Sequence, residues 1–391
     1  SRIAFTPRFT SRVPASGLIP LIVSPCTSLY YLLYNDNQPV TAMFNFLPRL
    51  LLALVLFSTA AQADRQVTDQ LNRQVTLPDR ITRAVVLQHQ TLNLLVQLDA
   101  LPQVVGVLSS WKKQLGPNYL RLAPTLATLP MPGDLTSVNI ESLLGLHPQV
   151  VFVANYAPPE MIAQIERAGI PVVAISLRRE AADQAGKMNP QLSDVHRAYT
   201  LGLQDGIRLI GEVMSRQPQA EALIKDVIQQ RALVAERLRD LPENQRVRVY
   251  MANPDLTTYG AGKYTGLMMR HAGALNVAAK DIQGFKQVSI EDVLKWDPAV
   301  IFVQERYPDV VQQILTSPQW QPIDAVKNKR VYLMPEYAKA WGYPMPEAMA
   351  LGELWMAKKL YPQRFADINL QQRVDAYYQR YYRATCCQSW Q

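Results

Sequence analysis

The segment SVNIESLLGLHPQVVFV at residues 137–153 recurs as QVSIEDVLKWDPAVIFV at residues 287–303, an offset of 150 positions (287 minus 137). Eight of the 17 aligned positions are identical, whereas unrelated segments share about one residue in 17 at a chosen offset. Each copy predicts a short helix with a glutamate near its start, Glu141 or Glu291, followed by a proline and an apolar run typical of a buried parallel strand. The repeat therefore indicates two lobes on one plan, with a cleft between them that suits ligand capture.

Short β-branched runs alternate with helix-like segments on either side of this repeat. The first array has predicted strands at 83–88, 103–108, 149–153 and 171–176, and the second has them at 246–251, 299–303 and 330–334. Strands that alternate with helices form parallel sheets covered on both faces. The predicted fold is therefore α/β, with two Rossmann-like lobes, each built on a parallel sheet.

A single long helix is predicted between the two arrays. Apolar residues recur at positions 220, 223, 224, 227, 228, 234, 238 and 241, and Pro218 and Pro242 bound the stretch. At about 1.5 Å per residue this helix spans roughly 35 Å, enough to join two lobes as a stiff strut with little hinge motion. The expected domains are an N-terminal lobe at 64–216, an inter-lobe helix at 217–242, and a C-terminal lobe with added helices at 243–391.

The N-terminal region has the features of an export signal. Residues 43–63, MFNFLPRLLLALVLFSTAAQA, combine Arg49, an apolar stretch and an A-x-A site ending at Ala63, and they are short for a membrane span. Cleavage there leaves a chain of 328 residues (391 minus 63) that begins at Asp64, not at a lipid-accepting cysteine. An uncleaved anchor is the alternative. Residues 1–42 are expected to be an upstream segment without a functional role.

Composition favours an exported binding protein over a nucleic-acid partner. The formal charge is +8, of which residues 1–63 carry +3, so +5 remains on the other 328 residues, and no run of five or six basic residues occurs. A monomer is expected. The cysteines are Cys26, Cys386 and Cys387, and because neighbouring cysteines rarely bridge without strain, no disulfide scaffold is expected.

Five segments together resemble one known family. They are the export signal, the paired N-I-E and S-I-E helices, the inter-lobe helix, RVYMANPDLTTYGAGKYTGLMMRHAGALNVA at 248–278, and NKRVYLMP at 328–335. In this order they are similar to the periplasmic solute-binding proteins of iron-siderophore, haem and vitamin B12 ABC importers, from Asp64 to about Gln372. The resemblance implies a membrane permease dimer as partner. It also implies that Glu141 and Glu291 form salt bridges with arginines of that permease.

The ligand of such a protein should lie beyond the carboxyl ends of the strands. The residues that follow the predicted strands form a cationic and aromatic set. They are His89, Trp111, Lys112, Tyr156, Arg178, Arg179, Tyr259, Lys263, Arg306, Tyr307, Tyr337, Lys339 and Trp341. Such a lining suits an anionic metal chelate, because Arg and Lys pair with its oxygens while Tyr and Trp pack against a flat organic shell. The segment 178–196 is long enough to cover the cleft mouth.

The predicted cargo is a ferric siderophore, with haem, a corrinoid, a molybdate-like oxyanion or a bare divalent metal as alternatives. A bare Zn²⁺ or Mn²⁺ needs three or four donors, and after residue 63 the histidines are His89, His147, His196 and His271, without an HxH motif. His147 is expected on a solvated turn, and no metal site or resident cofactor is predicted. No G-x-S-x-G, H-E-x-x-H or P-loop motif occurs, so no enzyme activity is expected, an enzyme acting in the cleft being a remote alternative.

Overall fold

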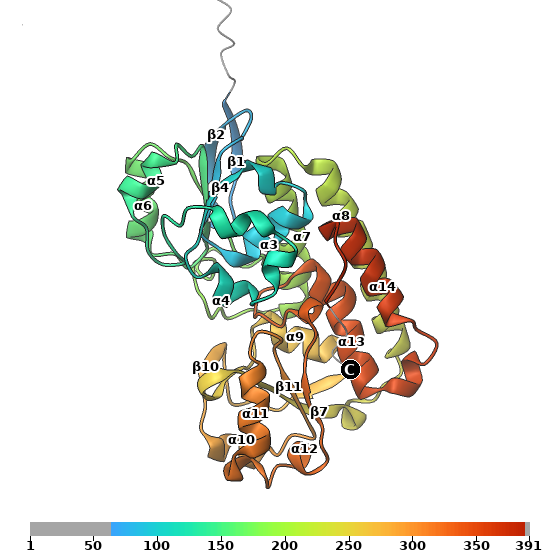
Figure 1. Cartoon of the computed structure of the whole chain (residues 1–391). Coiled ribbons are helices and arrows are strands. Elements are labelled where there is room, and N and C mark those ends of the chain that lie inside the picture. Colours follow the sequence, from blue (N-terminus) through green and yellow to red (C-terminus); the bar gives the residue numbers. More distant parts are fainter. Residues whose placement is uncertain (1–63, 388–391) are drawn as a thin grey trace, which may run out of the picture. The chain divides into compact units, whose positions relative to one another are not determined.

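The computed structural model describes residues 64–387 (Figure 1). The predicted upstream segment and signal peptide lie outside the described residues. The first sheet contains four parallel strands in the order β4-β3-β5-β6, namely β3 (Ala84–Val86), β4 (Val104–Val107), β5 (Val150–Ala154) and β6 (Val172–Ile175). The second has the order β12-β11-β7-β9, from β7 (Val247–Ala252), β9 (Ala274–Asn276), β11 (Val300–Val303) and β12 (Val331–Leu333). The predicted α/β fold with two parallel sheets is confirmed.

Helices follow the strands in both lobes. In the first lobe they are α3 (His89–Gln97), α4 (Trp111–Leu115), α5 (Ile140–Gly145), α6 (Pro159–Arg167) and α7 (Val195–Val213). In the second they are α9 (Tyr264–His271), α10 (Ile290–Trp296), α11 (Pro308–Thr316) and α12 (Asp324–Lys327). Every residue of β5 and β11 is buried, which explains why these strands are continuous apolar runs in the sequence.

The internal repeat is a repeat of structure as well. Helix α5 leads into β5, and helix α10 leads into β11. The turn between helix and strand places His147 (φ 48°) and Asp297 (φ 43°) in the same left-handed conformation. Both residues are exposed, so the solvated turn predicted for His147 is confirmed.

Two short antiparallel pairs were not predicted. Strand β1 (Asp64–Thr68) pairs with β2 (Gln74–Pro78), and β8 (Thr257–Tyr259) pairs with β10 (Phe285–Gln287). The strands of the second pair have three residues each, too few for a visible alternation of apolar and polar residues. Among residues 64–387 no helix is both long and apolar enough to cross a membrane.

The helix between the lobes, α8, covers Gln217–Arg237, whereas the predicted inter-lobe helix extended to residue 242. It packs against α7 and against the C-terminal segment of the chain, which contains η8 (Ala348–Gly352), α13 (Glu353–Leu360), α14 (Leu370–Tyr377) and η10 (Tyr378–Tyr382). In Figure 1, α8 and α14 run along the same side of the two lobes. The lobes are therefore joined by more than one helix.

The C-terminal helices, predicted as part of the second lobe, also contact the first. The hydroxyl of Tyr382 donates to Asn93 Oδ1 at 2.8 Å, and the hydroxyl of Tyr377 donates to Gln97 of the same helix, α3. All four tyrosines at positions 377, 378, 381 and 382 are buried, as expected of packed core. This return of the chain to α3 limits how far the lobes can move apart.

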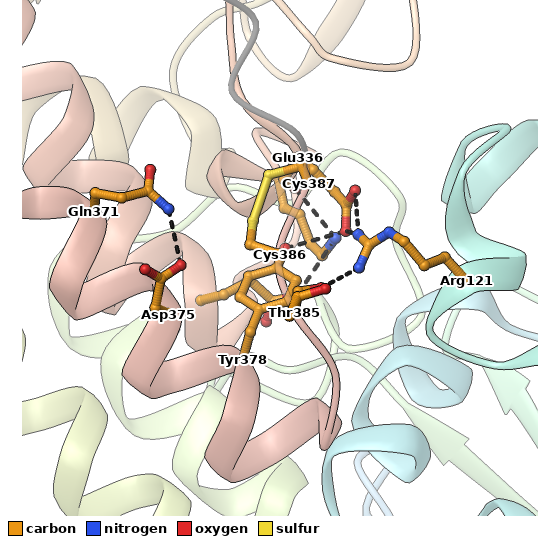
Figure 2. Close-up of a disulfide and its surroundings, with 10 residues drawn as sticks. Arg121, Glu336, Gln371, Asp375, Tyr378, Thr385, Cys386 and Cys387 are labelled. Carbon is orange, nitrogen blue, oxygen red and sulfur yellow. Dashed lines mark hydrogen bonds and ion pairs between the residues drawn. A yellow bond between two sulfur atoms is a disulfide. The ribbon is translucent and has the colours of Figure 1, made fainter.

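A disulfide between Cys386 and Cys387 lies at the end of the described chain (Figure 2). Because it joins adjacent residues, it closes no loop across the fold. Figure 2 shows Arg121 of the first lobe beside it. Arg121 Nη2 lies 3.0 Å from both carboxylate oxygens of Glu336 and its Nη1 donates to the carbonyl of Thr385. The tail is thereby held where the two lobes meet.

Candidate functional site

Both lobes belong to one compact unit, and some of the predicted ligand residues, among them Arg306 and Lys263, make contacts from one lobe to the other. Eight of the thirteen are at least nine-tenths buried: His89, Trp111, Arg178, Tyr259, Lys263, Tyr337, Lys339 and Trp341. Tyr156, Arg306 and Tyr307 are partly buried, whereas Lys112 and Arg179 are exposed. The junction at the carboxyl ends of the strands is therefore largely closed, where the sequence predicted a cleft.

One group at this junction centres on Arg306, which follows β11. Its guanidinium lies 5.3 Å from the ring centre of Trp341 and 5.0 Å from that of Tyr307, within the range of cation–π attraction. Its Nη1 donates to the carbonyl of Gln114 in the first lobe at 2.8 Å. A positive charge of the second lobe is thus held between aromatic rings and against the first lobe.

His89, at the start of α3, faces the same group. Its ring centre is 5.4 Å from that of Trp341. Burial, and then the charge of Arg306, hold the pKa of His89 well below its usual value, so the imidazole is neutral at physiological pH. Within the described chain its buried Nδ1 has no hydrogen-bond partner. A neutral imidazole that carries its proton on this nitrogen can donate to an anion.

A second group surrounds Lys263, which precedes α9. Its Nζ donates to the carbonyl of Met188 in the first lobe at 2.6 Å and lies 4.6 Å from the ring centre of Tyr343. The hydroxyl of Tyr343 donates to Oδ1 of Asn155 at 3.0 Å, and Asn155 directly follows β5. Burial, and then the nearby charge of Arg178, lower the pKa of Lys263 to about 7.

The lowered pKa of Lys263 predicts a specific dependence of stability on pH. Between about pH 7 and 10 the unfolded chain carries a proton on Lys263 that the folded chain lacks, so this group makes stability rise with pH, by at most about 1.4 kcal/mol per pH unit. Below pH 7 both states are protonated and the full cost of burying the charge remains. Urea unfolding of K263M from pH 6 to 10 should lack this rise. If the wild type gained no more unfolding free energy than K263M between pH 7 and pH 9, the lowered pKa of Lys263 would be contradicted.

Three other predicted cations are compensated by carboxylates. Arg178 Nε lies 2.7 Å from Glu180 Oε2, with both side chains almost wholly buried, and Arg179 forms an ion pair at 2.7 Å with Asp205 on the exposed face of α7. Lys339 Nζ lies 3.5 Å from Glu347 Oε1, and neither side chain is exposed. Among residues 64–387, neither Arg306 nor Lys263 has a carboxylate within ion-pair distance. Arg306 is therefore an uncompensated positive charge at the junction, whereas Lys263, with its pKa lowered to about 7, is charged in only part of the molecules at neutral pH.

The remaining predicted residues are Lys112 and Trp111 and three tyrosines. The exposed Lys112 lies with its Nζ 5.6 Å from the ring centre of Trp111, which is buried in the core. Tyr259 packs on Phe285 with ring centres 4.7 Å apart, and Tyr156 lies 6.3 Å from Tyr343 by the same measure. Burial raises the pKa of Tyr156, and that of Tyr337, above the usual tyrosine value. These phenols are neutral and can act as hydrogen-bond donors.

A carboxyl group also lies at the junction. Glu305 precedes Arg306 and accepts a hydrogen bond of 3.3 Å from Trp341 Nε1. Burial raises the pKa of Glu305, although Lys339 and Arg306 act against this rise. The shift makes this carboxyl easier to protonate than an exposed glutamate.

Comparison with known proteins identifies the family of this chain. The periplasmic binding protein family model matches residues 85–338, which is more than half of the chain. The chain belongs to the periplasmic binding protein family. The resemblance seen in the sequence is thus confirmed, and the protein is a binding protein and not an enzyme.

The relatives of this periplasmic binding protein cover nearly all of its described residues. The molybdate-binding protein MolA of Haemophilus influenzae is 63% identical over 341 residues, which are 87% of this chain and 97% of MolA. A solved structure of MolA bound to molybdate matches with a TM-score of 0.82 at 64% identity, over 83% of this chain and 99% of that one. A periplasmic solute binding protein from Veillonella parvula matches with a TM-score of 0.66 at 26% identity, over 83% and 94% of the two chains.

The predicted docking glutamates of this periplasmic binding protein lie on its surface. Glu141 and Glu291 are exposed, on α5 and α10. The helices are capped by other residues, because Asn139 accepts from the backbone of Ser142 and Ser289 accepts from that of Asp292. Within the described chain neither glutamate has an ion-pair partner. Each glutamate lies in the first turn of its helix, where a negative charge is favourable, and its carboxylate is open to solvent.

The segment after β6 reaches the second lobe of the binding protein, as predicted for a cover of the cleft mouth. Besides Met188, it contributes Asn189 Oδ1, which accepts from the backbone of Phe285 at 2.9 Å, and the carbonyl of Pro190, which accepts from Gln283 Nε2 at 2.9 Å. Gly284 (φ 82°) lies so close to Asn189 that a Cβ there would be 2.5 Å from its side chain. These contacts fasten the two lobes at one end of the junction.

Proposed function

We propose that this chain is the substrate-binding component of an ABC importer and captures a small oxyanion of the molybdate type between its lobes. The observation that carries the proposal is the 63% identity to MolA, a protein named for binding molybdate, over 97% of that protein's length. The oxyanion was an alternative to the predicted ferric siderophore, and this similarity favours the oxyanion.

The chemistry of the junction supports an anionic ligand. Arg306 is a cation without a carboxylate partner in the described chain, Lys263 is an amine that a bound anion would help to protonate, and His89 adds an unpartnered nitrogen. The oxygens of an oxyanion accept charge-assisted hydrogen bonds from such groups, each contributing roughly 1.5 to 3 kcal/mol. A bare divalent cation is disfavoured, because Arg306 lies close enough to His89 to lower its pKa.

The closeness of the lobes supports a small ligand. The contacts that cross the junction include Arg306 to Gln114 at 2.8 Å, Lys263 to Met188 at 2.6 Å and Tyr343 to Asn155 at 3.0 Å. A siderophore, haem or corrinoid would have to separate these groups by many ångströms, against the additional links made by α8 and the C-terminal helices. An oxyanion needs only a local displacement.

Export follows from the same proposal. We expect the signal peptide at 43–63 to be removed after Ala63, leaving an N-terminal lobe at 64–216, α8, and a C-terminal lobe from 243. The first described strand, β1, begins at Asp64, which pairs with Pro78. Sequencing the N-terminus of the protein from the periplasmic fraction should give Asp64 as first residue. Retention of residues 1–42 would contradict this expectation.

Isothermal titration of the purified chain tests the proposal. Molybdate and tungstate should bind with a stoichiometry near one, while ferric siderophores, haemin, cobalamin and Zn²⁺ should not bind at the same concentrations. Trp341, whose ring lies beside Arg306, allows a parallel measurement of indole fluorescence. Saturable binding of a ferric chelate without binding of molybdate would restore the siderophore hypothesis.

A further inference from the structure

The internal repeat preserves surface residues as well as core residues. In the aligned segments 137–153 and 287–303, six position pairs are exposed in both copies: 137/287, 139/289, 141/291, 144/294, 145/295 and 147/297. Only two of the six pairs are identical, the glutamates Glu141 and Glu291 and the leucines Leu144 and Leu294. The shared glutamates already have a proposed role, and the shared leucines do not.

Packing explains the identities in the core but not those at the surface. Phe152 and Phe302 are both fully buried in the sheets. Leu144 and Leu294 are 43% and 37% exposed, and the apolar face of each helix is supplied by a neighbouring buried residue, Leu143 or Val293. One exposed leucine on a surface needs no explanation. Two exposed leucines at equivalent positions of the two lobes do need an explanation.

Each leucine lies on the same helix face as the glutamate of its lobe. The spacing is three residues in both helices (144 minus 141 and 294 minus 291), which makes the two side chains neighbours on the helix surface. Each lobe therefore presents an acidic group beside an apolar group. In Figure 1, α5 and α10 lie on the side away from α8 and α14, one in each lobe.

We infer that Glu141 with Leu144, and Glu291 with Leu294, form two equivalent docking pads for the two subunits of a membrane permease. The inference rests on the proposed function and adds the apolar half of the contact. A two-fold symmetric partner presents the same site twice, so a binding protein made of two similar lobes meets it with two similar patches. Each permease subunit should offer a basic residue to the glutamate and an apolar pocket to the leucine. The leucine excludes water from the ion pair beside it.

The double variant L144A/L294A tests this inference against the permease reconstituted in nanodiscs. We expect the affinity for the permease to fall about a hundredfold, roughly tenfold for each leucine, mainly through faster dissociation. Its dependence on salt should persist, because the glutamates remain, whereas E141A/E291A should lose that dependence. The matched control is I228A/L315A, which truncates two aliphatic side chains, 48% and 42% exposed, on α8 and α11. This variant should bind the permease as the wild type does.

Molybdate titration of the same samples separates the inference from the proposed function. If the wild type binds molybdate and L144A/L294A binds the permease as tightly as the control, the pads do not include the leucines. If the wild type fails to bind molybdate, the proposed cargo is wrong, whatever the leucines do. If the wild type is a dimer in solution and L144A/L294A is a monomer, the leucines mediate self-association and the permease assignment is overturned.

Discussion

Replacing both Glu141 and Glu291 by alanine is expected to abolish uptake while leaving oxyanion affinity within about twofold of the wild type. Removing one partner of a hydrogen-bonded charge pair at an interface costs about 2 to 5 kcal/mol, and two such losses reduce docking by several hundredfold or more. Ligand binding should be unaffected, because both carboxylates are exposed and take no part in the junction. The measurement is uptake by cells, together with titration of the purified variant.

The chain offers a matched control for this variant. Glu160 and Asp309 are exposed acids in the first turns of α6 and α11, which follow β5 and β11 in the two lobes. E160A/D309A removes the same charge from equivalent helices and should transport normally. Equal loss of uptake in both double variants would reduce the effect to net charge and contradict specific docking.

Neutralising Arg306 is expected to weaken oxyanion binding about a hundredfold. A charge-assisted hydrogen bond contributes roughly 1.5 to 3 kcal/mol, which corresponds to about a ten- to hundredfold change in dissociation constant. The upper end applies because Arg306 is partly buried between Trp341 and Tyr307 and has no carboxylate partner in the described chain. The measurement is the dissociation constant of R306Q for molybdate by calorimetry.

The control for R306Q is R179Q. Both arginines follow predicted strands, but Arg179 is bound by Asp205 on an exposed helix face. R179Q should therefore bind molybdate as the wild type does. A second readout is the titration of His89 by NMR, whose pKa should rise in R306Q because Arg306 contributes to lowering it. Unchanged molybdate affinity in R306Q would remove Arg306 from the site.

Most of the fold could be predicted from the sequence, because buried parallel strands leave apolar runs. All seven predicted strands lie within two residues of an observed one, as for 299–303 and β11. The contacts of the C-terminal helices could not be predicted, since they depend on residues very distant in the chain. Tyr382 and Asn93, for example, are 289 positions apart. The predicted end of α8 was too late, because apolar residues at 238 and 241 continue the helical spacing after the helix has ended at Arg237.

The candidate site was predictable as a set of positions but not as a set of charges. The rule that ligands bind beyond strand ends identified His89, Lys263 and Arg306 together with residues that have other partners. The residues that have other partners are recognised by their ion pairs, which are not visible in the sequence. Arg179 and Asp205, for example, are 26 positions apart. Tyr343 and Gln114 were missed because one lies in a loop and the other within α4, beyond the residues that directly follow a strand.

Native mass spectrometry of the chain taken directly from the periplasm tests the central claim most directly, because it reads the cargo without a choice of ligand. We predict one species that begins at Asp64 and carries the mass of a single molybdate or tungstate ion, with the element confirmed on the same fraction by plasma mass spectrometry. A species carrying a ferric siderophore, haem, a corrinoid or a bare divalent metal, with no molybdenum or tungsten, would contradict the account.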